Sequence, residues 1–201
     1  MHAYLAGLGT GLSLIVAIGA QNAFVLKQGL MRRHVFATCA FCALSDSLLI
    51  LGGVMGAGAI AARMPWFLEA MRWGGAAFLL IYGARAFRAA WRGGVAMRAG
   101  QGAAGLGATL GVLAALTWLN PHVWLDTVVL LGSVSAGFQD RAGFALGAIS
   151  GSALFFFALG YGARLLAPVF ARPGAWRVLD LCVGLVMWAI AAGLAFGGQP
   201  G

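Results

Sequence analysis

Residues Gly19–Gly29 read GAQNAFVLKQG and end a run of apolar residues that begins near Ala3. The run is long enough to cross a bilayer as a helix, which takes roughly 20 mostly apolar residues. Two adjacent amides, Gln21 and Asn22, interrupt it close to its end. Buried amides need hydrogen-bond partners, so the pair raises two readings: a defect in a helix that faces lipid, or a break in a helix that faces the protein interior.

The composition of the whole chain is that of a membrane protein. Of 201 residues, 62% are apolar and 9% are charged, whereas soluble domains are about half apolar and a quarter charged. The formal net charge of +8 does not require a nucleic-acid partner. Basic residues beside membrane segments set their orientation and contact anionic lipid. We therefore expect membrane lipid, and no nucleic acid, as a partner.

Apolar runs long enough to span a membrane recur along the chain. They cover about Ala3–Leu26, Phe36–Ala62, Phe67–Ala90, Leu106–Gly132, Gly143–Val169 and Trp176–Phe196. The connections between them are too short for a soluble domain. The sequence thus predicts an all-α membrane protein of about six transmembrane helices, folded as a single transmembrane domain over residues 1–201.

Lysine and arginine are distributed unevenly over the two sides of such a protein. The connections after the first, third and fifth runs carry ten of these residues: Lys27, Arg32, Arg33, Arg85, Arg88, Arg92, Arg98, Arg164, Arg172 and Arg177. The other side carries three: Arg63, Arg72 and Arg141. Because basic connections stay in the cytoplasm, we expect both termini on the outer side. The alternative is that the interrupted first run does not cross fully, which would place the N-terminus in the cytoplasm.

The fourth run contains a second interruption, LTWLNPHVWLDTVVLLG, in which Asn120 is followed by Pro121 and His122. Proline removes a backbone donor and clashes with the preceding turn, so Pro121 predicts a helix break. Asn22 and Asn120 lie at matching positions of two halves, about 1–98 and 99–201. Since each half has three runs, the halves enter the membrane from opposite sides. This pattern predicts an inverted repeat, whose interrupted helices mark the binding site.

Two carboxylates lie deep in apolar runs. Asp46 is ten residues into the second run, near the bilayer midplane, and Asp126 lies between the midplane and the outer face. A charge at that depth is costly, and no lysine or arginine within four residues can pair with either acid. Each is a candidate cation site or proton-relay carboxylate. The alternative is an acid satisfied by Ser, Thr or water, or by a distant partner such as Arg72.

The remaining polar residues support narrower expectations. Asp180, three residues from Arg177, is expected to form a surface ion pair with it. His122 could exchange a proton or hydrogen-bond a carbonyl that Pro121 leaves free. Cys39 and Cys42 share a helix face with Asp46, a spacing that permits a soft metal, but buried cysteine more often behaves as a small hydrophobe. We expect no resident metal.

No P-loop, HExxH or Ser/His/Asp arrangement occurs in the chain. A nucleotide-driven pump and a hydrolase of the soluble kind therefore have no support. The sequence predicts no catalytic residue, no cofactor and no enzymatic activity.

Three blocks together resemble a known family: GAQNAFVLKQGLMRRHV near the start, ALSDSLLILGGVMG in the second run and TWLNPHVWLDTVVLLGS in the fourth. They look like the LysE/ArgO family of bacterial basic amino-acid exporters, and the similarity extends over nearly the whole chain. The resemblance implies a multi-pass protein of the bacterial inner membrane that exports L-arginine, or L-lysine, without ATP. It also implies that the family's membrane-embedded aspartates correspond to Asp46 and Asp126.

The resulting hypothesis assigns a role to each polar residue. Asp46 and Asp126 receive the cations of a basic amino acid, and backbone N–H groups near Pro121 or Asn22 receive its carboxylate. The residues expected to hold the broken segments and complete the pocket are Gln21, Asn22, Asn120 and His122. The alternatives are export of neutral amino acids, export of a divalent metal cation, and a structural membrane subunit. Homo-oligomerisation is left open.

Overall fold

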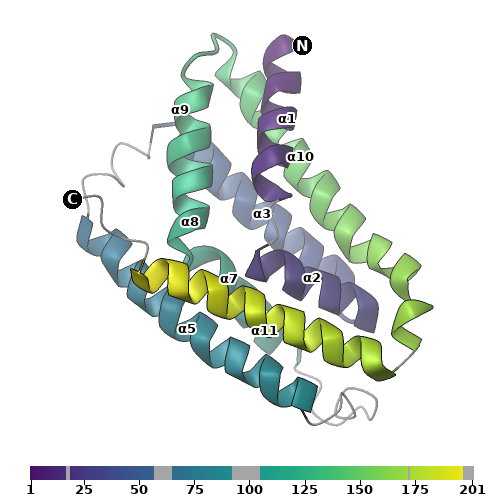
Figure 1. The fold of residues 1–201 in the computed structure, drawn as a ribbon. Coiled ribbons are helices and arrows are strands. Elements are labelled where there is room, and N and C mark those ends of the chain that lie inside the picture. Colours follow the sequence, from purple (N-terminus) through teal and green to yellow (C-terminus); the bar gives the residue numbers. More distant parts are fainter. Residues whose placement is uncertain (17–18, 57–64, 92–104, 172, 197–201) are drawn as a thin grey trace.

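The computed structural model describes residues 1–16, 19–56, 65–91, 105–171 and 173–196. Every regular element within these ranges is a helix (Figure 1), which confirms the all-α prediction for this part of the chain. The elements are α1 (His2–Ile15), α2 (Ala20–Met31), α3 (Val35–Val54), α5 (Pro65–Trp91), α7 (Leu106–Trp118), α8 (Pro121–Val123), the π-helix η1 (Trp124–Leu130), α9 (Leu131–Ser135), α10 (Arg141–Gly162), the short 3-10 helices η2 (Ala163–Leu166) and η3 (Val169–Ala171), and α11 (Pro173–Phe196).

Length and hydropathy identify three helices among the described residues that could each cross a membrane: Val35–Val54, Arg141–Leu166 and Gly174–Phe196. A fourth span results if α1 and α2 are counted as one broken span. α7 is apolar but shorter than a membrane span. The predicted count of about six therefore stays a prediction. The second expected run extends to residue 62, but residues 57–64 lie outside the described ranges.

The first expected span is a broken helix that follows α10 along its length. α1 and α2 meet at a bend of 85°. Gly7 packs on the Phe144 carbonyl near the start of α10, and Gly29 packs on the Gly160 carbonyl near its end. A Cβ at either glycine would overlap the carbonyl oxygen, so the glycines permit this close approach of the backbones. The chain thus runs from one end of α10 to the other despite the bend.

The segment from α7 to α9 follows α3 in the same manner. Trp118, at the end of α7, donates from Nε1 to Ser45 Oγ at 3.3 Å in the middle of α3. Farther on, Gly132 packs on the backbone of Gly53 near the end of α3. In both broken segments, therefore, the chain is parallel to the long helix that it contacts.

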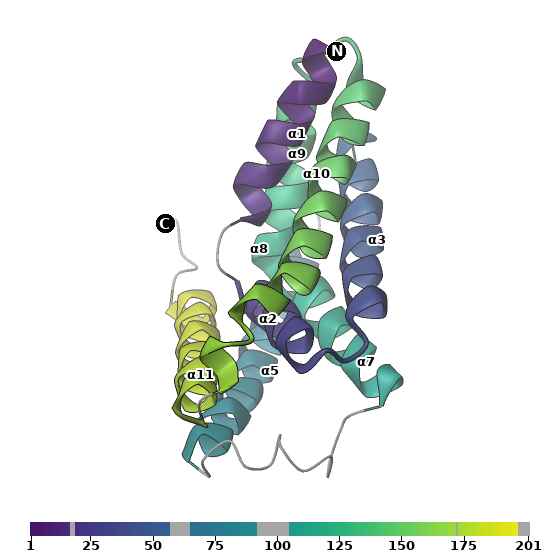
Figure 2. The ribbon, with the colours of Figure 1, turned by 90° about the vertical axis from the view of Figure 1, so that its right-hand side faces the viewer.

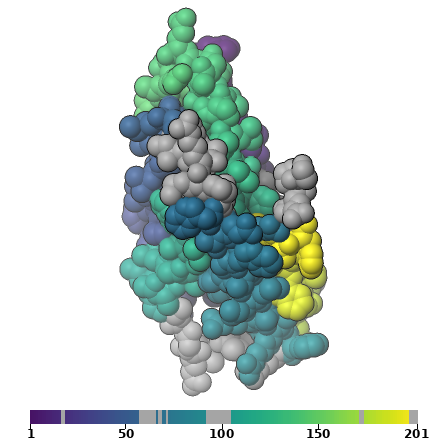
Figure 3. All heavy atoms as spheres, turned by 90° about the vertical axis from the view of Figure 1, so that its left-hand side faces the viewer, coloured from purple at the N-terminus to yellow at the C-terminus, as the bar shows by residue number. Residues whose placement is uncertain are grey.

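α5 and α11 form an antiparallel pair that lies across one end of the other helices (Figures 1 and 2). Trp188 packs on Gly83, and Phe87 packs on Gly184. Arg72 on α5 donates hydrogen bonds to the carbonyls of Leu194 and Ala195 at the end of α11. The face drawn in Figure 3 shows α5 below the atoms of α9 and α10.

Polar side chains are buried inside the protein, whereas large apolar side chains are exposed on its outside. Ser45, Thr117 and Ser152 are buried among the helices. The long helices carry exposed leucines, isoleucines and tryptophans on their outer faces, including Leu48, Ile81, Leu154, Leu185 and Trp188. This arrangement is typical of a protein whose outer surface contacts lipid.

Candidate functional site

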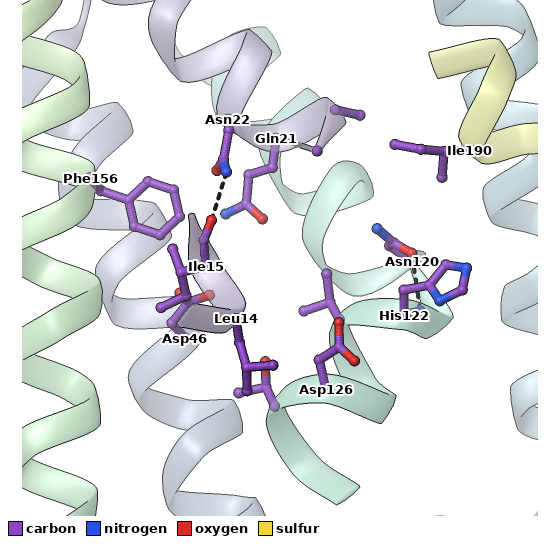
Figure 4. Close-up of a pocket in the computed structure, with 14 residues that line it drawn as sticks. Leu14, Ile15, Gln21, Asn22, Asp46, Asn120, His122, Asp126, Phe156 and Ile190 are labelled. Atoms are coloured by element: carbon purple, nitrogen blue, oxygen red, sulfur yellow. Dashed lines mark hydrogen bonds between the residues drawn. The ribbon is translucent and has the colours of Figure 1, made fainter. Parts of the chain in front are cut away.

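A cavity of about 300 Å³ lies where the two broken segments meet (Figure 4). This volume is at the small end of the range for ligand pockets. The cavity is lined by Leu14, Ile15, Gly19, Ala20, Gln21, Asn22, Asp46, Asn120, His122, Val123, Asp126, Thr127, Phe156 and Ile190. All six residues predicted for a binding site are among them. The sequence placed them in three separate runs, and the fold brings them together.

The first break is held by Asn22. Its Nδ2 donates to the Ile15 carbonyl at 2.8 Å, so an amide from α2 satisfies an acceptor at the end of α1. Gly19, in extended conformation, precedes α2, and no side chain caps this helix N-terminus. The N–H groups of a first helical turn have no partners within their own helix. Gly19 and Ala20 line the cavity, so this uncapped N-terminus borders it.

The second break lies at Asn120, where the helix was predicted to end. Pro121 occupies the first position of α8, where its missing N–H is tolerated. Asn120 Oδ1 caps the new turn by accepting a hydrogen bond from the His122 backbone N–H at 3.1 Å. Trp124 Nε1 donates to the Trp118 carbonyl at 3.2 Å. Side chains therefore satisfy both sides of this break, and the N-terminus of α8, unlike that of α2, is capped.

Asp126 lies in a π-helical turn directly after the second break. Such turns are rare and occur frequently at functional sites. The carboxylate is partly buried and borders the cavity beside Thr127. His122 precedes it by one turn and also borders the cavity, although its side chain is largely exposed. Figure 4 shows Asp126 and His122 on the same side of the cavity.

Asp46 borders the cavity from α3 and is only 5% exposed. Ser152 on α10, itself fully buried, donates from Oγ to Asp46 Oδ2 at 2.7 Å. The expectation that a serine or threonine could satisfy this acid is thus met for one oxygen. The carboxylate also lines the cavity. The structure is therefore compatible with both interpretations of Asp46, an acid satisfied by a serine and a candidate cation site.

Gln21 completes the predicted set. It lines the cavity, its amide faces the Cys42 thiol on α3, and its buried Nε2 has no oxygen or nitrogen acceptor in the part of the chain that the structure describes. A polar hydrogen that is buried beside a cavity is available to a ligand.

Sequence reasoning missed Ser152 and the apolar wall of the cavity, which consists of Leu14, Ile15, Phe156 and Ile190. Leu14 and Ile15 immediately precede the first break, which could have indicated them. Nothing in the sequence around Ser152 or Ile190 separates those residues from their neighbours.

One ion-pair prediction is wrong. Asp180 does not lie at the surface with Arg177: it is completely buried, and its Oδ1 is 2.5 Å from Lys27 Nζ on α2. The sequence suggested Arg177 because it is one helical turn from Asp180, whereas the actual partner, Lys27, is 153 residues away along the chain. Lys27 was expected to lie in a cytoplasmic connection, but it belongs to a helix.

Cys39 and Arg72, which the sequence offered as a possible metal ligand and a possible partner for the buried acids, do not line the cavity. Cys39 is buried and donates from Sγ to the Phe156 carbonyl at 3.2 Å. Arg72, considered as a distant partner for the buried acids, binds the last carbonyls of α11. Within the described residues, no group of three or more His, Cys, Asp or Glu side chains is arranged to hold a metal ion.

Residues 12–198 match the family described as LysE type translocator. The chain is 46% identical to the arginine exporter protein ArgO of Yersinia enterocolitica, over 96% of this chain and 95% of that protein. It is 42% identical to the arginine exporter proteins ArgO of Escherichia coli K12 and Serratia proteamaculans, over 96% and 97% of this chain and 92% and 97% of theirs. No solved structure gives a significant match.

Proposed function

Because the chain belongs to the LysE type translocator family, we propose that it exports L-arginine across the bacterial inner membrane. Three relatives that match nearly the whole chain at 42–46% identity are named arginine exporters. Family and apolar helices together make it an integral membrane protein. L-lysine, which also carries a side-chain cation, is the second substrate that the site chemistry would accept.

The main support for this proposal is that two carboxylates and one helix N-terminus border the same cavity. Asp46 and Asp126 approach it from α3 and η1, and the uncapped N-terminus of α2 borders it. A basic amino acid has two cations and one carboxylate. Helix N-termini favour anions, so the cavity offers two negative groups and one positive group to a ligand with the complementary set.

In the proposed complex, the guanidinium group of arginine binds one aspartate through charge-assisted hydrogen bonds. The α-ammonium binds the other aspartate. The α-carboxylate accepts hydrogen bonds from the first-turn N–H groups of α2 rather than from α8, because Asn120 already caps α8. Gln21 Nε2 is a further donor for that carboxylate, and the four apolar side chains of the wall enclose the aliphatic part of arginine.

The transport step is proposed to be alternating access between two inverted three-helix halves of a single domain, with six spans in all. Reciprocal packing supports this proposal. α1 from the first half packs along α10 in the second, and α9 from the second packs along α3 in the first. α5 and α11 then pair with each other in antiparallel fashion. Two halves related by a two-fold axis are expected to pack in this way, with the first span of each half against the second span of the other and the third spans against each other.

The direction of transport requires an energy source. A membrane potential that is negative inside opposes the exit of a cation by about 2.3 kcal/mol per charge per 100 mV. We propose that a high internal concentration of arginine or an inward proton movement offsets this cost. Proton coupling would arise because proton and substrate can compete for the same carboxylate. The basic ends of α2 and α5 would then face the cytoplasm, and both termini the outer side.

A reconstitution experiment tests the proposal. The purified protein is placed in lipid vesicles loaded with labelled L-arginine, and efflux is compared with that of the variant Asp46→Asn Asp126→Asn. We expect efflux from the wild-type vesicles and background leakage from the variant at equal protein content. Equal efflux from both would contradict the assigned binding mode. The exposed Glu69 provides a matched control, since Glu69→Gln removes a carboxylate away from the cavity and should leave efflux unchanged.

A further inference from the structure

Lys27 and Asp180 form an ion pair that the binding site does not use. The pair joins α2 to α11, with 2.5 Å between Nζ and Oδ1. The side chain of Lys27 is 14% exposed and that of Asp180 is 0% exposed. The second oxygen of Asp180, Oδ2, is buried and has no hydrogen-bond partner among the described residues. A carboxylate in this state holds one cation while its second oxygen is unoccupied.

The pair lies close to the cavity. Lys27 is five residues beyond Asn22 on α2, which corresponds to about 7 Å along the helix axis. It lies in the direction of Arg32 and Arg33, which follow the end of α2. Phe24, three residues before Lys27 on α2, packs against Tyr82 with ring centroids 6.1 Å apart and joins α2 to α5. Along α2, Lys27 therefore lies between the residues that line the cavity and the basic residues that follow the helix.

A buried ion pair resists separation. Removing one partner leaves an uncompensated charge, which is strongly destabilising, although replacing both partners by neutral groups is often tolerated. Movement of α2 away from α11 would expose Asp180 to this penalty unless another cation took the place of Lys27. The side-chain guanidinium or ammonium group of a basic amino acid can do so, whereas the uncharged side chain of a neutral amino acid cannot.

We propose that the Lys27–Asp180 pair is a cation-selective gate, in which the side-chain cation of the substrate replaces Lys27 on Asp180 as it passes between the cavity and the basic end. This inference rests on the proposed export of a basic amino acid and assigns to the pair the rejection of neutral amino acids. Because Oδ2 has no partner among the described residues, a guanidinium can engage both oxygens of Asp180 once movement of α2 away from α11 exposes the carboxylate.

The experiment compares L-arginine with L-citrulline, its neutral isostere, in vesicles that contain the wild-type protein or Lys27→Gln Asp180→Asn. The wild type is expected to export arginine and retain citrulline. In the variant, the ratio of arginine to citrulline efflux should fall about tenfold or more, the value of one charge-assisted hydrogen bond. A second variant, Lys27→Met Asp180→Leu, replaces the pair by apolar groups and should lower the ratio similarly. Lys27→Arg, which retains a cation, should preserve the wild-type ratio of arginine to citrulline efflux.

Arg72→Gln is the matched control, because Arg72 also joins its helix to α11 through a partly buried cation. The ratio of arginine to citrulline efflux for Arg72→Gln should equal that of the wild type. A wild-type ratio in both double variants would overturn the gate, as would loss of both from the membrane, which would assign the pair to folding alone. If the wild type itself moves no arginine, the proposed function fails and the gate with it, an outcome distinct from an unchanged ratio.

Discussion

Ser152 on α10 donates a hydrogen bond of 2.7 Å to Asp46 on α3, and both side chains are buried. The bond occupies Oδ2 of the carboxylate and joins helices from the two halves of the chain. It therefore determines how Asp46 is presented to the cavity. Ser152 contacts the acid but does not line the cavity, so in the proposed site it would influence a ligand only through Asp46.

Replacing this serine tests the role of the bond. We expect Ser152→Ala to weaken L-arginine binding by about tenfold, because a hydrogen bond to a charged group contributes about 1.5–3 kcal/mol. Binding of labelled arginine to the purified protein measures the effect. Ser150→Ala is the matched control, since among the described residues the Ser150 hydroxyl donates to the Leu146 carbonyl of its own helix and not to Asp46. Equal affinities for the two variants would show that the bond to Asp46 does not influence the site.

The packing of α1 on α10 predicts opposite results at two nearby glycines. A Cβ at Gly7 would overlap the Phe144 carbonyl, whereas a Cβ at Gly9 would meet nothing within 4 Å. Gly7→Ala should therefore lower stability by about 1–3 kcal/mol through overpacking. Gly9→Ala should leave stability unchanged or raise it by about 0.5–1 kcal/mol, since alanine is the better helix former. Thermal unfolding in detergent compares the two, and a lower Tm for Gly9→Ala than for Gly7→Ala would contradict this packing.

The second break depends on its cap. Asn120→Ala should destabilise the protein by about 1 kcal/mol, because the His122 N–H loses its acceptor. Asn120→Ser supplies another capping oxygen and should restore most of the loss. The same thermal assay distinguishes the variants. If serine were no better than alanine, the amide of Asn120 would have to act on the ligand or on packing rather than on the helix end.

The cysteines separate amino-acid export from metal export. Cys39→Ala and Cys42→Ala should retain arginine efflux, because neither thiol lines the cavity, although Cys39→Ala loses a bond to the Phe156 carbonyl. Efflux of labelled arginine, with protein content measured in parallel, checks this expectation. Abolished efflux from well-inserted variants of both cysteines would favour a site built on thiolates.

Much of the site could be predicted because its residues are locally anomalous. Asn22, Asp46, Asn120 and Asp126 are polar groups inside apolar runs, where each requires a partner or a cavity. Pro121 predicted the second break to the residue. The π-helical turn that carries Asp126 has no comparable signal, since its sequence differs little from that of an ordinary helix.

The remaining features depend on distant contacts. Asp180 pairs with Lys27 across 153 residues, and the nearer Arg177 made a surface pair the simpler reading. The 85° bend between α1 and α2 also follows from tertiary packing, because the amides indicate a break but not its angle. Hydropathy and length likewise do not identify the fourth expected run as a span: α7 is shorter than a membrane-crossing helix, and α8, η1 and α9 follow it as separate short elements.

Two carboxylates and an uncapped helix end are proposed to make this cavity selective for a basic amino acid. The most direct measurement loads vesicles containing the purified protein with labelled L-arginine, L-lysine and L-leucine and records the efflux of each, with and without a proton gradient. We expect efflux of arginine, accelerated when protons can move in the opposite direction, and retention of leucine. Efflux of leucine with retention of arginine would contradict it.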